Sequence, residues 1–309
     1  MIVAGIDIGT LTCRLLIAEI LSGGFLREID SDRRILRLGE GVDQAHLLKT
    51  EAMNRVIEVL SEWQETITVH SVEATVVVAT SAVREATNQQ EFLNCVWQRT
   101  GLQIEVLSGE EEARRSLLGI DFGLSIRSDN ILGLDIGGGS TELFRTVREG
   151  GAVAASLDWG VVRLTERYFQ SDPPSEHEVN VAEHCIRRDI QKIQSMFGEL
   201  TDMMLVGTAG TVTTLAAMAQ ELAMYEPSRI HNYSLSLEKI HELENVILAC
   251  TAAERSRLPG LEAGREGVIV AGTIILRTIM ETFGFEHCHV SDYGLREGII
   301  VDLFKRNVV

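Results

Sequence analysis

The sequence predicts an α/β protein with two similarly built halves. The first observation behind this prediction is an internal repeat, because residues 6–15 align with residues 134–143 without a gap, so that Asp7 matches Asp135. The second is the alternation of apolar runs that suit buried strands with segments of helical spacing, which is typical of α/β sheets. A repeat of this kind indicates two related domains rather than a solenoid of short units.

The composition is that of an ordinary globular protein. The 309 residues are 45% hydrophobic and 24% charged, and such a chain is long enough for two cores. The formal net charge of −17 argues against a general nucleic-acid or anionic-membrane surface. The most apolar window, 205–218, is interrupted by glycine and threonine, and the N-terminus lacks the features of a signal peptide. We therefore expect neither a nucleic-acid nor a membrane partner.

The cysteines bear on the compartment. There are five, and none of them has CxxC spacing, so neither a disulfide framework nor a thiolate zinc site is favoured. Because free thiols persist in a reducing compartment, we expect a cytoplasmic protein.

The predicted elements of the first half follow from apolar runs and helical spacing. A turn at Gly23-Gly24 precedes the third strand, and Arg33, Arg34 and Arg37 suit a solvated edge strand. Ser108 is a predicted N-cap, and the glutamates after it favour the helix dipole. The expected order is strands over 2–8, 12–19 and 25–30, a helix over 51–66, a strand over 72–80, a helix over 88–100, a strand over 104–107 and a helix from Ser108.

A linker is predicted at 121–129, where glycine and serine interrupt the pattern. We therefore expect domains at 1–122 and 123–309, with the last helix, 297–309, able to pack back on the first. Ser175 begins a long amphipathic helix. The expected order in the second half is a hairpin over 131–144, a strand over 152–157, a helical segment over 160–169, a helix over 176–197, a strand over 203–206, helices over 212–221, 238–250 and 267–283, and a strand end at 290 before the last helix.

Two matching turns are the main candidates for ligand binding. In the second turn, Gly137-Gly138-Gly139 lets backbone N–H groups approach an anion without interference from Cβ atoms, and Ser140 adds a hydroxyl donor. A tight hairpin is the alternative for either turn alone, but two copies favour phosphate binding between the halves. In the repeat, Arg14 occupies the position that Glu142 occupies in the second half. This difference suggests that one half binds phosphate directly while the other holds a cation or a water.

Three further residues are candidates for phosphate contacts. Arg84 follows a predicted strand, and α/β sheets bind ligands at the carboxyl ends of strands, although a helix-end ion pair is the alternative. Gly210 lies in a strand-to-helix turn that either presents N–H donors to an anion or serves close helix packing. Arg265 precedes an apolar helix and either caps its neighbour or faces the cleft.

Several segments, taken in order, resemble the exopolyphosphatase and guanosine pentaphosphate phosphohydrolase family, within the fold that actin, hexokinase and acetate kinase share. The resemblance covers the whole chain and implies two ribonuclease H-like (actin-like ATPase) domains, with mixed sheets flanked by helices and an interdomain cleft. It implies the short two-domain form, because the sequence contains no His-Asp dipeptide of an added helical domain. The segments are IDIGTLTCRLLIAEI, ATSAVREATN, SGEEEARRSLLGI, LDIGGGSTEL, SLDWGVVRLTERYF, VGTAGTVTTLAAM and VSDYGLREGII.

The resemblance also implies a site. Glu112 would be the base that activates water. Asp135 and Glu142 would hold Mg²⁺ directly or through waters, and Asp7 would contribute from the other half. The residues that would clamp the phosphates are Gly9, Thr10, Thr12, Arg14, Arg84, Gly137, Gly138, Gly139, Ser140, Gly210 and Arg265.

Two departures from the family pattern limit this transfer. Thr10-Leu11 stands where relatives often have Ser-Asn, which puts one side-chain contact to phosphate in doubt. Arg265-Glu266-Gly267 replaces a more usual Arg-Ala-Asp, which puts the role of a carboxylate in doubt.

The implied activity is release of terminal phosphate from inorganic polyphosphate by Mg²⁺-assisted attack of water. Hydrolysis of guanosine pentaphosphate at its 5′ end is the alternative, because one cleft can accept either anion. An ATP-dependent small-molecule kinase and a non-catalytic sensor of polyphosphate or an alarmone are further hypotheses, and the presence of Glu112 argues against both. A homodimer is suggested by the resemblance alone.

Overall fold

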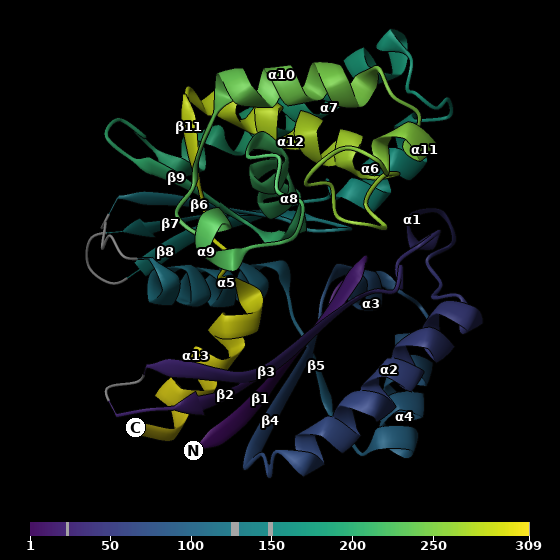
Figure 1. Ribbon diagram of the computed structural model, residues 1–309, viewed down its shortest axis with the longest axis vertical. Helices are drawn as coiled ribbons and strands as arrows, with labels where there is room; N and C mark the ends of the chain where they lie inside the picture. The colour runs from purple at the N-terminus through teal and green to yellow at the C-terminus, as the bar shows by residue number, and fades with distance from the viewer. Residues whose placement is uncertain (23–24, 125–129, 148–150, 309) are drawn as a thin grey trace. The chain divides into compact units, whose positions relative to one another are not determined.

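The computed structural model describes residues 1–22, 25–124, 130–147 and 151–308. The chain forms two compact units (Figure 1). Unit 1 comprises Met1–Phe122 and Gly294–Val309, and unit 2 comprises Gly123–Tyr293.

Unit 1 is built on a mixed five-stranded sheet. The central strand β1 pairs antiparallel with β2 and parallel with β4, so its carboxyl end lies beside the carboxyl end of β4. In order across the sheet, the strands are β3 (Leu26–Ile35), β2 (Thr12–Ile20), β1 (Ile2–Ile8), β4 (Ala74–Ala79) and β5 (Ile104–Val106).

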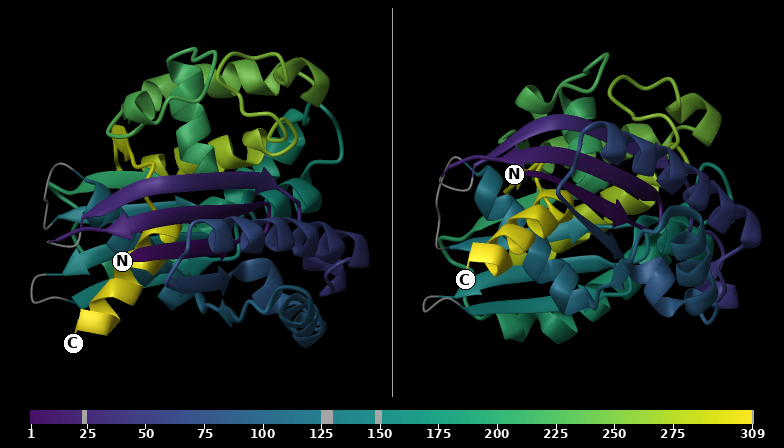
Figure 2. Two further views of the ribbon diagram at one scale, coloured as in Figure 1. Left: turned by 60° about the horizontal axis from the view of Figure 1, so that its bottom comes forward. Right: turned by 90° about the horizontal axis from the view of Figure 1, so that it is seen from below.

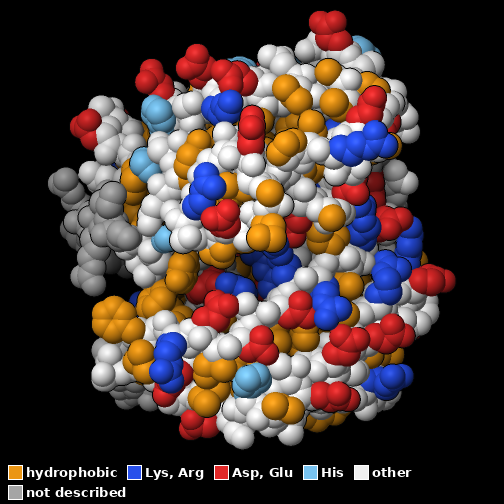
Figure 3. Space-filling view, in the orientation of Figure 1, with side chains coloured by type: hydrophobic (Ala, Val, Ile, Leu, Met, Phe, Trp, Pro, Cys, Tyr) orange, Lys and Arg blue, Asp and Glu red, His pale blue; other side chains and the backbone are white. Residues whose placement is uncertain are grey.

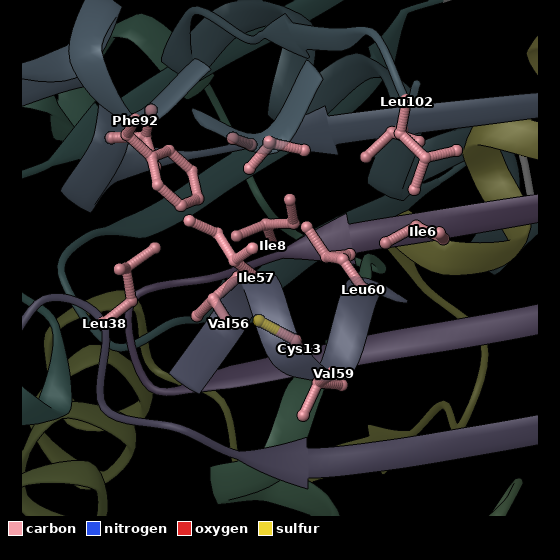
Figure 4. Packing of buried hydrophobic residues seen from close by; sticks show 14 of the residues in the cluster. Ile6, Ile8, Cys13, Leu38, Val56, Ile57, Val59, Leu60, Phe92 and Leu102 are labelled. Atoms are coloured by element: carbon pink, nitrogen blue, oxygen red, sulfur yellow. The ribbon is translucent and has the colours of Figure 1, made fainter. Parts of the chain in front are cut away.

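Helices cover both faces of this sheet (Figures 1 and 2). The alternation of side chains along β1 sends Ile6 and Ile8 to a core shared with α2 (Thr50–Val69) and α4 (Gln89–Thr100), and sends Val3 to a core shared with α13 (Leu295–Val308). Figure 4 shows the first of these cores. The remaining helices are α1 (Val42–Ala45), α3 (Ser81–Glu85) and α5 (Gly109–Gly123).

Unit 2 repeats this sheet and adds one strand. The hairpin β6–β7 and the strand β8 correspond to β1, β2 and β3, and β9 lies parallel beside β6 as β4 lies beside β1. In order across the sheet, the strands are β10 (Ser234–Ser236), β11 (His287–Val290), β9 (Met204–Thr208), β6 (Ile131–Ile136), β7 (Thr141–Val147) and β8 (Gly151–Leu157). The shared strand order confirms that the two halves are similarly built.

The helices of unit 2 centre on a buried helix, α12. Arg277 of this helix pairs with Glu183 of α7 and with Glu244 of α10. These charged groups, which are largely removed from water, join the three helices. The helices are α6 (Val161–Tyr168), α7 (Glu176–Gln194), the 3-10 turn η1 (Ser195–Phe197), α8 (Ala209–Ala219), α9 (Pro227–Ile230), α10 (Leu237–Leu248), α11 (Ala252–Arg255) and α12 (Ile269–Phe283).

Both predicted helix caps are confirmed. The hydroxyl of Ser175 accepts from the backbone N–H of Glu178 in a full capping box, and the Ser108 hydroxyl accepts from the N–H of Glu111. Arg33 and Arg34 lie on β3, an edge strand as expected, although that strand is longer than predicted.

Two predicted boundaries were wrong. Helix α8 begins at Ala209 instead of 212, because Ala209 adopts a φ of 68°, which turns the chain directly from strand into helix. Helix α5 continues to Gly123, so the expected linker at 121–129 begins as helix, and its residues 125–129 lie outside the described residues. The predicted turn at Gly23-Gly24 also lies outside them.

Among the described residues, no helix is long and apolar enough to cross a membrane. All five cysteines are free thiols, and two of them are fully buried. Burial raises the pKa of the Cys288 thiol to about 12, and burial together with the charge of Asp7 raises the pKa of Cys13 well above its usual range. These two thiols therefore stay protonated.

Helices α5 and α13 cross at two glycines. A Cβ atom added at Gly298 would lie 1.7 Å from the carbonyl oxygen of Arg115, and one added at Gly119 would lie 1.9 Å from the carbonyl oxygen of Gly294. The helices can approach this closely only because neither glycine has a side chain.

We therefore predict that Gly298→Ala destabilises the protein by about 1–3 kcal/mol through overpacking at this crossing. Urea denaturation gives the free energy of unfolding from the transition midpoint. Gly267→Ala is the matched control, because a Cβ atom there meets nothing within 4 Å. An unchanged midpoint for Gly298→Ala would show that the crossing is looser than described.

Candidate functional site

The first matching turn joins β1 to β2. The N–H of Gly9 donates to the carbonyl of Thr12 at 3.0 Å, directly after the strand pair Ile8 and Cys13. Thr10 and Leu11 therefore form the tip of a tight hairpin.

The second matching turn joins β6 to β7 in the same way. The N–H of Gly137 donates to the carbonyl of Ser140 at 3.0 Å, and Gly138 and Gly139 form the tip. The residues that match in sequence thus make the same hydrogen bond in both units, so the sequence repeat corresponds to a repeated turn geometry.

A neighbouring segment fixes the carbonyl groups of the first turn. The N–H groups of Leu36 and Arg37 donate to the carbonyl of Leu11 at 2.9 Å, and the N–H of Gly39 donates to the carbonyl of Thr10 at 2.8 Å. A Cβ atom at Gly39 would lie 2.3 Å from the Thr10 side chain, so this close approach requires glycine.

The first turn of α6 fixes the carbonyl groups of the second turn. The N–H of Val161 donates to the carbonyl of Gly137 at 3.0 Å, and that of Val162 to the carbonyl of Gly138 at 2.9 Å. A Cβ atom at Gly160 would lie 2.3 Å from the Gly138 carbonyl, so this contact also requires glycine. The peptide carbonyls point toward the helix, and planar trans peptides hold their N–H groups in the opposite direction.

Several donors of the two turns have no partner among the described residues. The backbone N–H groups of Thr10, Leu11, Gly138 and Gly139 donate to no described group, and the buried hydroxyl of Thr10 has no hydrogen-bond partner there. Buried donors need acceptors. Consecutive N–H groups of this kind suit the oxygens of a phosphate chain.

Charged side chains stand beside each turn. In unit 1, Asp7 on β1 lies directly across from Arg14 on β2, and Arg14 lies across from Arg33 on β3. Within the described part of the chain, the side chain of Arg14 makes no hydrogen bond or ion pair, so its guanidinium donors are available for an anion.

In unit 2 the corresponding pair is acidic. Asp135 on β6 lies directly across from Glu142 on β7, and both side chains are buried. The Ser156 hydroxyl on β8 donates to Oε1 of Glu142 at 2.7 Å. Two buried carboxylates on adjacent strands repel each other unless a cation or a proton lies near them.

The acidic pair fits magnesium in its donor atoms. Mg²⁺ prefers oxygen ligands and usually takes one or two carboxylates, with waters and substrate phosphates completing its coordination. Among the described residues, no three His, Cys, Asp or Glu side chains are grouped as metal ligands. The donor set therefore suits a cation that shares its coordination with waters and substrate, and not one held in an all-protein cage.

Glu112 lies in the first turn of α5 and is paired with Arg84. Nη1 of Arg84 donates to Oε2 of Glu112 at 3.1 Å and to the carbonyl of Leu107 at 2.7 Å. Glu110, one of the glutamates expected to favour the helix dipole, is exposed. Arg84 thus forms an ion pair at the start of α5, and its assignment as a phosphate ligand stays a prediction.

Gly210 and Arg265, named separately from the sequence, lie together. A Cβ atom at Gly210 would lie 2.2 Å from Cζ of Arg265, so the guanidinium packs on the backbone of the first turn of α8. Its Nε donates to Glu262 at 2.5 Å, and the side chain is buried. A positive group at a helix N-terminus strengthens that position as an anion site.

Within each unit these groups emerge from one edge of the sheet. In unit 1 the first turn follows β1, helix α3 with Arg84 follows β4, and helix α5 with Glu112 follows β5. The last residues of these three strands are neighbours across the sheet. In unit 2 the second turn and α8 follow β6 and β9. This is the edge at which α/β sheets bind ligands.

Sequence reasoning missed the segments behind the turns. Leu36 to Gly39 and Gly160 to Val162 hold the loop carbonyls through backbone N–H groups, which no side-chain pattern marks. The glycines were the available signal, because Gly39 and Gly160 each permit a close backbone contact.

Comparison with known proteins identifies the family. A model described as the Ppx/GppA phosphatase family matches residues 16–307. The chain belongs to the Ppx/GppA phosphatase family. The predicted family, fold class and enzyme class, a phosphoric anhydride hydrolase, are thereby confirmed.

Particular relatives of this Ppx/GppA protein differ in length. Exopolyphosphatase 2 of Mycobacterium tuberculosis is 34% identical over 314 residues, which cover 97% of this chain and 98% of that protein. A guanosine-5′-triphosphate,3′-diphosphate pyrophosphatase of Aeromonas hydrophila is 31% identical over 304 residues, covering 98% of this chain and only 60% of that protein. The crystal structure of the Aquifex aeolicus Ppx/GppA family member is 35% identical, with a TM-score of 0.83, and the match covers 99% of this chain and 98% of that one.

We predict that Gly160→Ala weakens binding of inorganic tripolyphosphate by at least about tenfold, because the added Cβ atom displaces the second turn by more than the few tenths of an ångström that a phosphate site tolerates. Gly160 has a φ of −116°, which alanine adopts without strain, so the variant changes the contact alone. Isothermal titration measures the dissociation constant, and circular dichroism checks the fold. A folded variant with unchanged affinity would exclude this contact from shaping the turn.

Proposed function

We propose that this protein releases orthophosphate from the end of inorganic polyphosphate by attack of water. The observation that carries the proposal is a buried carboxylate, Glu112, at the same sheet edge as a turn with unpartnered N–H donors. The similarity to a mycobacterial protein named exopolyphosphatase over nearly the full length of both chains supports the substrate.

In this mechanism the Glu112 carboxylate takes a proton from a water molecule while the oxygen of that water attacks the terminal phosphorus. The bond between that phosphorus and the bridging oxygen breaks, and the shortened polyphosphate leaves. Phosphoryl transfer depends mainly on positioning and charge neutralisation, which the N–H donors of both turns, Arg14, Arg265 and the start of α8 supply.

Magnesium is the proposed cofactor. Asp135 and Glu142 would hold it, with Asp7 contributing, and the ion would neutralise charge on the phosphate oxygens. The acidic cross-strand pair supports this assignment, because a bound cation relieves the repulsion between two buried carboxylates.

Guanosine pentaphosphate is the second candidate substrate. The similarity to the Aeromonas protein supports it, although this chain spans only 60% of that relative. Acidic side chains are spread over the face shown in Figure 3, with basic ones among them, which fits the net charge of −17 and argues against a general nucleic-acid surface. A cytoplasmic location and a homodimer stay predictions.

The direct test is a phosphate-release assay with long-chain polyphosphate and guanosine pentaphosphate side by side in Mg²⁺. We expect faster release from polyphosphate. Faster release from guanosine pentaphosphate would transfer the assignment to the second candidate, and release from neither would refute the proposed function.

We predict that Glu112→Gln lowers kcat at least about a hundredfold and leaves the affinity for substrate nearly unchanged, as expected when a general base is lost. Glu110→Gln is the matched control, because it removes an exposed carboxylate from the same helix turn. Normal turnover in Glu112→Gln would remove this residue from the mechanism.

We also predict that chelation with EDTA abolishes phosphate release and that added Mg²⁺ restores it. Asp135→Asn should raise the Mg²⁺ concentration for half-maximal activity at least about tenfold. Mutation of a residue that only hydrogen-bonds to a metal ligand typically lowers metal affinity by that factor or more, and loss of a ligand itself should lower it at least as much. Equilibrium dialysis checks metal binding separately from turnover. Full activity in EDTA would contradict the metal assignment.

A further inference from the structure

In the part of the chain that the structure describes, the side chain of Arg84 bonds to the protein through only one of its guanidinium nitrogens. Both hydrogen bonds of the Arg84 side chain use Nη1, one to the carbonyl of Leu107 and one to Oε2 of Glu112. Within the described residues, Nε and Nη2 of Arg84 make no hydrogen bond. One edge of the guanidinium is therefore committed to the protein, and the other edge keeps its donors.

The committed edge holds the start of helix α5. Leu107 precedes the N-cap residue Ser108, and the N–H of Glu112 donates to the Ser108 carbonyl at 2.9 Å. The two acceptors of Nη1 thus lie at the entry to α5 and in its first turn. One donor group that bonds to both fixes the Glu112 side chain relative to the backbone that carries it.

Arg84 is itself fixed from a different part of the sheet edge. Its N–H donates to the carbonyl of Thr80 at 3.0 Å, and the N–H of Thr80 donates to the carbonyl of Ile8, the residue before the first turn. The guanidinium therefore has a defined position relative to the turn and to Glu112, which lies on another element.

The neighbouring arginines of α5 are engaged elsewhere. Arg114 pairs with Glu111 and with Asp302 of α13, and Arg115 pairs with Glu105 of β5. The Glu112 side chain is only 9% exposed and that of Arg84 is 25% exposed. A carboxylate this buried needs a nearby cation to stay ionised, and Arg84 supplies one from α3.

We propose that Arg84 is a positioning residue for Glu112 and a phosphate ligand at the same time. Its Nη1 edge holds Oε2 of the carboxylate that takes the proton from water, while its Nε and Nη2 edge binds an oxygen of the terminal phosphate. One planar group thereby sets the distance between the base and the phosphorus under attack. This inference rests on the proposed function, because it assigns Glu112 as the base.

The positioning role predicts how two substitutions combine. Arg84→Ala should lower kcat at least about tenfold, because the base loses its fixed orientation. In the Glu112→Gln background the same change should lower kcat by less than about threefold, since the base that it positions is already absent. Losses in kcat that multiply would refute the positioning role.

Arg14→Ala is the matched control for this cycle. Arg14 is a proposed phosphate ligand on β2 that makes no contact with Glu112 among the described residues. Its loss should raise KM by a similar factor with or without Glu112→Gln. If Arg14 showed the same coupling as Arg84, the effect would be a general loss of substrate binding, and the proposal would fail.

A conservative substitution distinguishes the role of the charge of Arg84 from the role of its planar geometry. Arg84→Lys keeps the charge but offers one point donor in place of a planar fork. We expect KM to stay near that of the unaltered protein while kcat stays as low as in Arg84→Ala. Full recovery of kcat by lysine would show that charge alone is sufficient and would overturn the bridging geometry.

A measurement on the protein alone tests the contact without reference to turnover. In ¹⁵N-arginine NMR spectra of the substrate-free protein, the Nη signals of Arg84 should shift in Glu112→Gln and stay unchanged in Glu110→Gln. Unchanged Arg84 signals in Glu112→Gln would refute the pair even in an active phosphatase. A shift in a protein that hydrolyses neither phosphate substrate would keep the pair and reject the proposed function, so the two failures are distinct.

Discussion

The site depends on hydrogen bonds that hold backbone carbonyl groups away from the ligand. In both units a hairpin turn is backed by a segment whose N–H groups bind carbonyls of that turn, which are those of Thr10 and Leu11 in unit 1 and those of Gly137 and Gly138 in unit 2. A peptide group that has its carbonyl fixed on one side presents its N–H on the other, so the backing segment converts an ordinary β-turn into a row of donors. Gly39 and Gly160 allow the backing segments to come this close. In the proposed site, the hydroxyls and arginines nearby would act on an anion that these donors hold.

The two units use this common frame with opposite charges. Asp7 stands across from Arg14 in unit 1, whereas Asp135 stands across from Glu142 in unit 2. A single exchange at one cross-strand position therefore places a guanidinium group beside the first turn and a second carboxylate beside the other. Because the hydrogen bond that closes each hairpin is the same in both units, this difference in side-chain chemistry does not require a difference in strand pairing. Such a division fits a hydrolase in which an anionic chain and a divalent cation are bound together.

Much of this architecture could be predicted from the sequence, because it depends on patterns within short segments. The matching turns, the cap at Ser175 and the edge position of Arg33 all follow from local residue chemistry, and the structure confirms them. The immediate start of α8 could not be predicted, since it depends on a left-handed conformation at Ala209 that alanine rarely adopts. The pairing of Arg84 with a carboxylate joins elements distant in sequence, and no local pattern specifies which carboxylate an arginine meets.

The most direct measurement is amide NMR of the two turns during titration with inorganic tripolyphosphate in Mg²⁺. The account predicts that the backbone amide protons of Leu11, Gly138 and Gly139 move downfield as they begin to donate to phosphate oxygen, while those of Gly9 and Gly137, already bonded within the turns, move little. Saturable binding that leaves the tip amides of both turns unshifted would contradict the central claim, because the phosphate would then be held without the backbone donors that the carbonyl hydrogen bonds expose.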